Sequence, residues 1–172
     1  MTPPRRKDRH IRPTLLLVGE GDAECELLRC LRTLYTRDHQ SLRVVICSAR
    51  GGGAPSIIDY AIRQLAQANY DRAAALLDTD TAWPTVWRKK AQARRLLLLG
   101  SEPCIEALLL QVVGVQISGT SAEHKKRFRL HFNGHPHDDG LIARHYTREV
   151  WDQAHGKFEV LARLIALMSG ED

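Results

Sequence analysis

Four short aliphatic runs are spaced along the first two thirds of the chain. The first, residues 14–18 (TLLLV), has no polar break, which is typical of a strand covered on both faces. The other three are 42–47 (LRVVIC), 73–80 (AAALLDTD) and 95–100 (RLLLLG). We predict that each run forms a β-strand.

The segments between these runs carry apolar residues at helical spacing. After residues 19–21 (GEG), apolar residues recur with this period as far as Tyr35. Further helices are expected from Pro55, from Pro84 and after Ser101, whose side chain suits an N-cap. Strand and helix thus alternate four times. This order predicts an α/β, Rossmann-like fold with about four mainly parallel strands, right-handed crossovers and helices on both faces.

The character of the sequence changes after residue 113, where Gly, Ser, Asn, His and Pro become frequent. A final amphipathic helix is expected over 157–169. We therefore divide the chain into a basic N-terminal tail (1–13), an α/β core (14–113) and a mostly helical extension of the same domain (114–172). A chain of 172 residues is the size of one domain with a full hydrophobic core.

Composition narrows the class of protein. The chain is 44% hydrophobic and 26% charged, and no apolar run approaches the roughly 18 residues of a membrane span. The N-terminus lacks the apolar core of a signal peptide, so we expect a cytoplasmic protein with no membrane association. The four cysteines form no CxxC pair, so we expect buried free thiols rather than a zinc site or disulfides.

Carboxylates follow two of the four predicted strands. Glu20 follows the first strand directly, and Glu24 lies one helical turn further on. Asp78 and Asp80 close the third strand, where their spacing puts both side chains on one side of an extended chain. Parallel sheets bind ligands at the carboxyl ends of their strands. Carboxylates gathered there repel one another unless a cation lies among them, and oxygen ligands without His or Cys favour Mg²⁺ or Mn²⁺.

Each acid alone has a simpler interpretation as a solvated turn residue or a helix cap, and Asp78 or Asp80 could cap the helix at Pro84. The set favours the metal site because its members follow strands that would share one edge of the sheet. The glycines around Glu20 would allow a tight turn and the close approach of a phosphate.

Basic residues are concentrated in two places. The net charge is +5 and the isoelectric point is near 9.2, and much of the excess lies in the N-terminal tail and in residues 124–129 (HKKRFR). Such clusters can neutralise phosphates and release condensed counterions. We expect nucleic-acid contacts from Lys125, Lys126, Arg127 and Arg129; the alternative is a solvated tail and a solvated helix face.

Two other groups are weaker candidates. The histidines and aspartates of residues 131–139 (HFNGHPHDD) could bind a transition metal, but a polar loop is the favoured interpretation. Trp83 and Trp87 could stack on bases, although packing against the sheet is favoured.

Three segments together resemble a known family. Residues 15–24 (LLLVGEGDAE) and 75–80 (ALLDTD) resemble the Toprim domain, whose signature is a glutamate in a glycine turn after strand one and a DxD after strand three. Residues 101–110 (SEPCIEALLL) are similar to a segment of RloB-like Toprim proteins, which are associated with restriction and phage-defence loci, often beside an ATPase. The resemblance covers roughly residues 14–113.

The resemblance implies roles for individual residues. Glu20 matches the Toprim glutamate, Asp78 and Asp80 the DxD, and Glu106 the acid of the S-x-P-C-x-E segment. The chain departs from the RloB-like segment at Glu102, Ile105, Ala107 and Gln111. Toprim proteins with intact acids generally use them to hold Mg²⁺ and to handle phosphodiester bonds.

These observations predict a Mg²⁺-dependent (or Mn²⁺-dependent) endonuclease acting on DNA or RNA in restriction or phage defence. Asp78 and Asp80 would anchor the metal, Glu20 would complete the site or act as general base, and Glu106 would join a second metal or orient the other groups. The alternative is a non-catalytic Toprim module that binds nucleic acid or protein and works with an ATPase partner. A nucleotide-binding protein is less favoured because residues 49–55 (ARGGGAP) lack the lysine of a P-loop. The chain is also too short for a topoisomerase.

Overall fold

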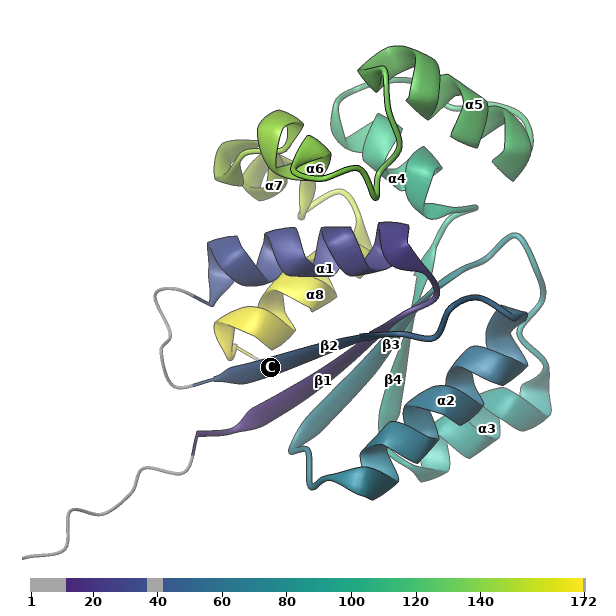
Figure 1. Cartoon of the computed structure of the whole chain (residues 1–172), viewed down its shortest axis with the longest axis vertical. Helices are drawn as coiled ribbons and strands as arrows, with labels where there is room; N and C mark the ends of the chain where they lie inside the picture. Colours follow the sequence, from purple (N-terminus) through teal and green to yellow (C-terminus); the bar gives the residue numbers. More distant parts are fainter. Residues whose placement is uncertain (1–11, 37–41, 172) are drawn as a thin grey trace, which may run out of the picture.

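The computed structural model describes residues 12–36 and 42–171, and most of the predicted basic tail (1–13) lies outside these residues. A four-stranded, all-parallel sheet has the order β2-β1-β3-β4 (Figure 1). Its strands are β1 (Thr14–Gly19), β2 (Arg43–Ser48), β3 (Arg72–Asp78) and β4 (Leu96–Ser101). The helices are α1 (Asp22–Tyr35), α2 (Gly53–Gln67), α3 (Thr85–Ala93), α4 (Ile105–Val112), α5 (Ser121–Phe132), α6 (Leu141–His145), α7 (Arg148–Ala154) and α8 (Glu159–Ser169).

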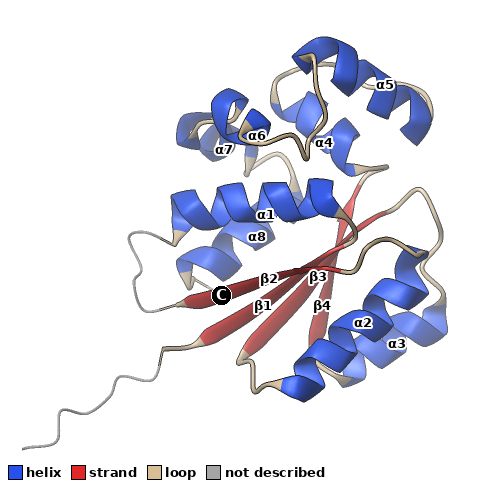
Figure 2. Cartoon of the chain, in the orientation of Figure 1, coloured by secondary structure: helices blue, strands red, loops and turns tan. Residues whose placement is uncertain are grey.

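Helices cover both faces of the sheet, as the alternation of elements predicted (Figure 2). Helices α1 and α8 lie on one face, and α2 and α3 lie on the other. The central strand β1 supplies both layers because successive side chains of a strand point to opposite faces. Leu15 and Leu17 belong to the core on the α1 side, whereas Leu16 and Val18 belong to the core on the α2 side. The α/β, Rossmann-like fold class predicted from the sequence is confirmed.

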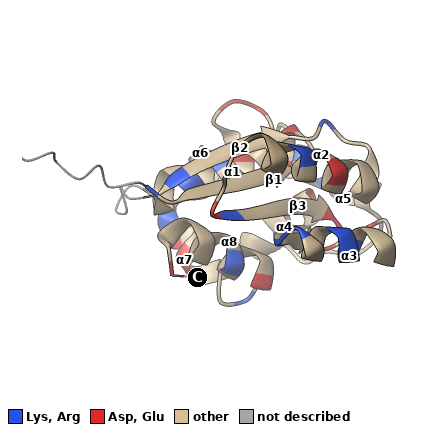
Figure 3. Ribbon diagram, turned by 90° about the horizontal axis from the view of Figure 1, so that it is seen from below, with Lys and Arg blue, Asp and Glu red and all other residues tan. Residues whose placement is uncertain are grey.

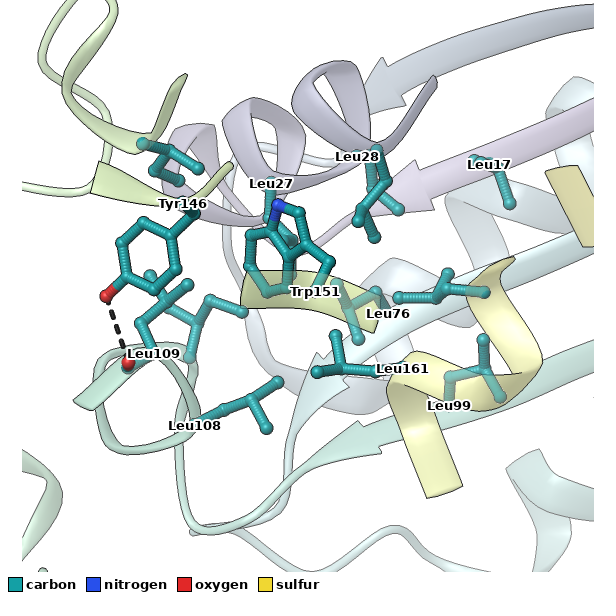
Figure 4. Packing of buried hydrophobic residues seen from close by; sticks show 14 of the residues in the cluster. Leu17, Leu27, Leu28, Leu76, Leu99, Leu108, Leu109, Tyr146, Trp151 and Leu161 are labelled. Atoms are coloured by element: carbon teal, nitrogen blue, oxygen red, sulfur yellow. Dashed lines mark hydrogen bonds between the residues drawn. The ribbon is translucent and has the colours of Figure 1, made fainter. Parts of the chain in front are cut away.

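The helices after residue 113 pack onto the α1 side and enlarge that core (Figure 4). Tyr146 and Trp151 are buried there, and their rings stack with centroids 5.0 Å apart. The Tyr146 hydroxyl donates a hydrogen bond of 2.9 Å to the carbonyl of Leu109 in α4. This contact ties the C-terminal helices to the helix that begins at the carboxyl end of β4.

Two boundaries differ from the sequence predictions. Strand β3 ends at Asp78 rather than at residue 80. Ser101 is the buried last residue of β4 and not an N-cap, because α4 begins only at Ile105, after Cys104 as its N-cap. Residues 102–104 intervene, and the proline among them has no N–H to offer a helix.

The prediction that two tryptophans pack against the sheet is confirmed. Trp83 and Trp87 lie against the core on the α2 side. All four cysteines are free; Cys25 and Cys104 are buried, and Cys30 and Cys47 are partly buried. No helix in the described part of the chain is long and apolar enough to cross a membrane.

Candidate functional site

The turn after β1 holds Glu20 against both neighbouring strands. Its N–H donates to the carbonyl of Leu76 in β3 (3.1 Å), and its carbonyl accepts from the N–H of Gly51 after β2 (2.7 Å). Gly19 permits this turn, because a Cβ there would lie 2.9 Å from both Cys25 Sγ and Glu24 Cβ. Oε2 of Glu20 accepts from the N–H of Asp78 at 3.1 Å. The half-buried Glu20 carboxylate is thereby aimed at the end of β3.

Asp78 is the buried centre of the acidic group. Its Oδ1 accepts hydrogen bonds from the N–H of Ile105 (3.0 Å) and from Oγ of Ser101 (3.3 Å). Asp78 therefore caps α4, and not the helix near Pro84 that the sequence suggested as an alternative. Burial, followed by the nearby charges of Glu24, Glu20 and Glu106, raises the pKa of Asp78 to about 8.

Glu24 lies in the first turn of α1 and is buried. Its Oε2 accepts from the N–H of Gly21 (2.8 Å), so one oxygen caps the helix. Burial raises the pKa of Glu24, and the charges of Glu20 and Glu106 act in the same direction. Glu24 therefore adds negative charge to a site in which carboxylates already repel one another.

Glu106 is the second residue of α4, and only 8% of its surface is exposed. Its Oε2 is buried and has no hydrogen-bond partner among the described residues. A buried carboxylate oxygen without a partner is costly, so it needs a bound cation, water or another group to satisfy it. This orphaned atom is the strongest structural indication that the acidic group has a ligand.

Asp80 does not join the buried acids. The chain leaves the extended conformation after Asp78, and the side chain of Asp80 is exposed. The N–H of Asp80 donates to the carbonyl of Pro103 at 3.0 Å, which fixes the loop. The prediction that Asp78 and Asp80 share one side of an extended strand is therefore wrong, because the strand ends between them.

The basic residues of α5 divide into different environments. The pKa of Lys125 is raised overall. Partial burial alone would lower this pKa, but the negative charges of Glu106 and Asp78 raise it by more. Lys125 thus lies close enough to the acids to feel their charge. Arg127 donates to the carbonyl of Gln116 (3.0 Å) and holds the preceding loop, whereas Lys126 and Arg129 are exposed.

Sequence reasoning missed two groups near the acids. The sequence suggests Ser101 as a helix cap, whereas its hydroxyl donates a hydrogen bond to Oδ1 of Asp78. Trp83 donates from Nε1 to the carbonyl of Asp78 at 3.0 Å, so it fixes the backbone of the acid as well as packing against the sheet.

Helix α3, which follows this loop, carries Arg88, Lys89 and Lys90 and forms a further basic segment (Figure 3). The RKK run at residues 88–90 is a sequence signal that marks this segment.

Residues 131–139 begin in the last turn of α5, which ends at Phe132, and continue as a polar loop. Asp138 accepts from the N–H of His135 (2.6 Å), and the rings of His135 and His137 stack with centroids 5.2 Å apart. These contacts give Asp138, His135 and His137 partners within the loop.

Mg²⁺ fits the chemistry of the acidic group. Between residues 12 and 171, the described side chains include no set of three His, Cys, Asp or Glu already arranged around one point. Mg²⁺ does not need such a set, because it keeps several waters and binds through one or two carboxylates. Glu106 offers a free buried oxygen, and Glu20 and Asp78 lie beside each other at the same edge of the sheet. A divalent cation would relieve the repulsion among them.

Comparison with known proteins gives no independent assignment. No family model matches the chain, and no curated protein or solved structure is significantly similar to it. The functional interpretation therefore depends on the acidic site, the basic residues and the sequence resemblance.

Proposed function

We propose that this protein is a Toprim-like, Mg²⁺-dependent nuclease that cleaves phosphodiester bonds of DNA or RNA, in the restriction or phage-defence context implied by the RloB-like segment. One observation carries the proposal: Glu20, Asp78 and Glu106 gather at the carboxyl edge of the sheet, and Glu106 has a buried oxygen with no partner. A cation is the simplest partner for such a group, and nucleic acid is the natural substrate of a basic chain built around it.

The acidic residues at the site would have different roles. Glu106, Asp78 and Glu20 would hold the metal, which when bound would neutralise charge on the scissile phosphate and lower the pKa of a water ligand. Glu20 is half-buried, so its carboxylate can also take a proton from water as general base. Asp80 is exposed, and its charge helps to raise the pKa of Lys125, so it lies near the site and would contact the ion from the solvent side.

Positive charge close to the acids would position the substrate. Lys125 is close enough to Glu106 and Asp78 to interact with their charges, so a phosphate bound over the acids would lie within its reach. Lys126 and Arg129 are exposed on the same helix and would contact more distant phosphates. Arg127 would contribute less, because it already donates to Gln116.

The test is cleavage of a panel of DNA and RNA substrates, including transfer RNA, with Mg²⁺, Mn²⁺ or EDTA. Glu106→Gln is the sharpest variant, because Oε2 makes no hydrogen bond that folding would lose. Asp71→Asn is the matched control, because Asp71 lies at the amino end of β3, opposite the end that carries the acids. Among the described residues it hydrogen-bonds only to Thr14. We expect metal-dependent cleavage that Glu106→Gln abolishes and Asp71→Asn preserves. Cleavage that persists in EDTA would contradict the proposal.

A second candidate is a non-catalytic module that binds nucleic acid or protein and works with an ATPase partner. The observation that favours it is the engagement of Asp78 in capping α4, which leaves fewer free carboxylate oxygens for a metal. Nucleic-acid binding that is equally tight in EDTA, with no cleavage of any substrate in Mg²⁺ or Mn²⁺, would favour this alternative.

A further inference from the structure

Strand β4 forms one edge of the sheet, with β3 on one side and no strand beyond it in the described part of the chain. The carbonyl of Ser101 accepts from the N–H of Thr79, so the backbone groups of Ser101 point toward β3. Because these groups alternate in direction along a strand, Leu96, Leu98 and Gly100 present their N–H and C=O groups to the outside. Each of these residues offers one donor and one acceptor for pairing.

Strand β4 itself lacks the charges and the proline that commonly prevent pairing. Residues 96–101 (LLLLGS) contain no charge and no proline, whereas natural edge strands are commonly protected by Lys, Pro, a bulge or a covering segment. Leu97 and Leu98 remain partly exposed. An apolar edge of this kind would be an aggregation site if nothing covered it.

Hollows flank the strand on both faces of the sheet. On the α8 side a groove runs along Leu99 and Gly100 and is bordered by Ile117, Phe158 and Val160. On the α3 side a second groove runs along residues 96–98 and is bordered by Trp83, Arg88 and Gln92. An added strand needs such space, because its side chains alternate between the two faces.

The charges at the two ends of β4 are complementary to each other. Exposed Arg94 and Arg95 precede the strand, and exposed Glu102 follows it. In an antiparallel pair the outward residues must face one another, which allows Leu98 to lie opposite Leu98 of a second copy. Leu96 then lies opposite Gly100, and the turn that carries Arg94 and Arg95 before β4 of one copy comes close to Glu102 after β4 of the other.

We propose that β4 is a homodimer interface, at which two copies pair their β4 strands antiparallel about a two-fold axis at Leu98. The contact is isologous, as most two-fold interfaces are, and it joins the two sheets into one continuous sheet. A second copy is favoured over a foreign peptide because the strand carries its own complementary charges, Arg at one end and Glu at the other. The inference is independent of the nuclease proposal.

The first test is sedimentation of the purified chain over a range of concentrations, with a charge-exchange series. Glu102→Arg places like charges near each other at both symmetry-related ends of the paired strands, so we expect the dimer dissociation constant to rise about tenfold or more. Adding Arg94→Glu and Arg95→Glu to this variant restores opposite charges and should restore the dimer. All three positions are exposed, so these changes leave the core intact.

The second test places a charge at the two-fold axis. Leu98→Lys brings two like charges together and should produce a monomer, whereas Val45→Lys, at a partly buried position on the opposite edge strand β2, should not. Hydrogen exchange should slow at the amides of Leu98 and Gly100 as the wild-type concentration rises. A wild-type chain that stays monomeric throughout would overturn the proposal, as would a dimer that neither Leu98→Lys nor Glu102→Arg weakens.

Discussion

Replacing Asp78 by Asn should stabilise the metal-free protein at alkaline pH. The folded-state pKa of Asp78, about 8, lies above its ordinary value of 3.8, so the folded protein binds the proton more tightly than the unfolded chain does. The stability linked to this group is therefore fully present below about pH 4 and declines as the pH rises toward about 8. Asn removes the charge but keeps an oxygen that can accept from Ile105 and Ser101.

The size of the effect follows from the pKa values. At about 1.4 kcal/mol for each factor of ten, the difference between 3.8 and about 8 corresponds to at most about 6 kcal/mol of unfolding free energy. Asn accepts hydrogen bonds less strongly than a carboxylate does, which reduces the gain in unfolding free energy by about 1–2 kcal/mol. We therefore expect a net gain of at most about 4–5 kcal/mol at pH 9, and little change or a small loss near pH 4.

The assay is urea unfolding in EDTA at several pH values between 4 and 9, on the wild type, Asp78→Asn and Asp71→Asn. Asp71 is the matched control with the opposite sign, because hydrogen bonds from Thr14 lower its pKa. The stability linked to Asp71 is present above its ordinary pKa and is lost as the pH falls. Wild-type and Asp78→Asn curves that run parallel from pH 4 to 9 would refute the reasoning. If the metal proposal holds, Mg²⁺ at pH 8 should stabilise the wild type more than Asp78→Asn.

Three further predictions concern function. Glu20→Gln should fold normally, with an unfolding free energy within about 0.5 kcal/mol of the wild-type value or above it. If Glu20 is the general base, the variant should lose roughly a hundredfold or more in cleavage rate. Thermal melts without metal and cleavage rates with metal test this, and near wild-type cleavage would rule out the role. Asp78→Ala combined with Asp80→Ala should lose Mn²⁺ binding in titration calorimetry, and binding equal to the wild type would be the contrary result. Lys125→Met should weaken nucleic-acid binding and flatten its salt dependence more than Lys126→Met does, because Lys125 lies nearer the acids; identical salt slopes for the two variants would show that this proximity does not matter.

The sequence predicted the fold well because its strongest signals are local. The uninterrupted run at residues 14–18 marks a strand buried on both faces, and the alternation of runs with helical patterns indicates parallel order. The boundaries were less predictable. Asp78 and Asp80 look alike in sequence, but hydrogen bonds from residues 79 and 80 to Pro103 bend the chain between them, and these partners lie more than twenty residues away.

The candidate site was predicted in its composition but not in its bonding. The sequence itself shows which acidic residues lie at strand ends or helix starts: Glu20, Glu24, Asp78 and Glu106. Which helix Asp78 caps could not be predicted, because the choice of Ile105 depends on the pairing of β3 with β4. The proximity of Lys125 to the acids likewise depends on how α5 packs on α4, which no local pattern encodes.

The turn at Glu20 also bears on how such a site can change during evolution. Its backbone is held by hydrogen bonds to Leu76 and Gly51, so the position of residue 20 depends on main-chain atoms that every substitution except proline retains. Among the described residues, the side chain of Glu20 makes one hydrogen bond, which it accepts from the N–H of Asp78. The fold can therefore accept a different side chain at this position without rebuilding the turn. Single substitutions at residue 20 would therefore change the charge at the end of β1 while the architecture persists.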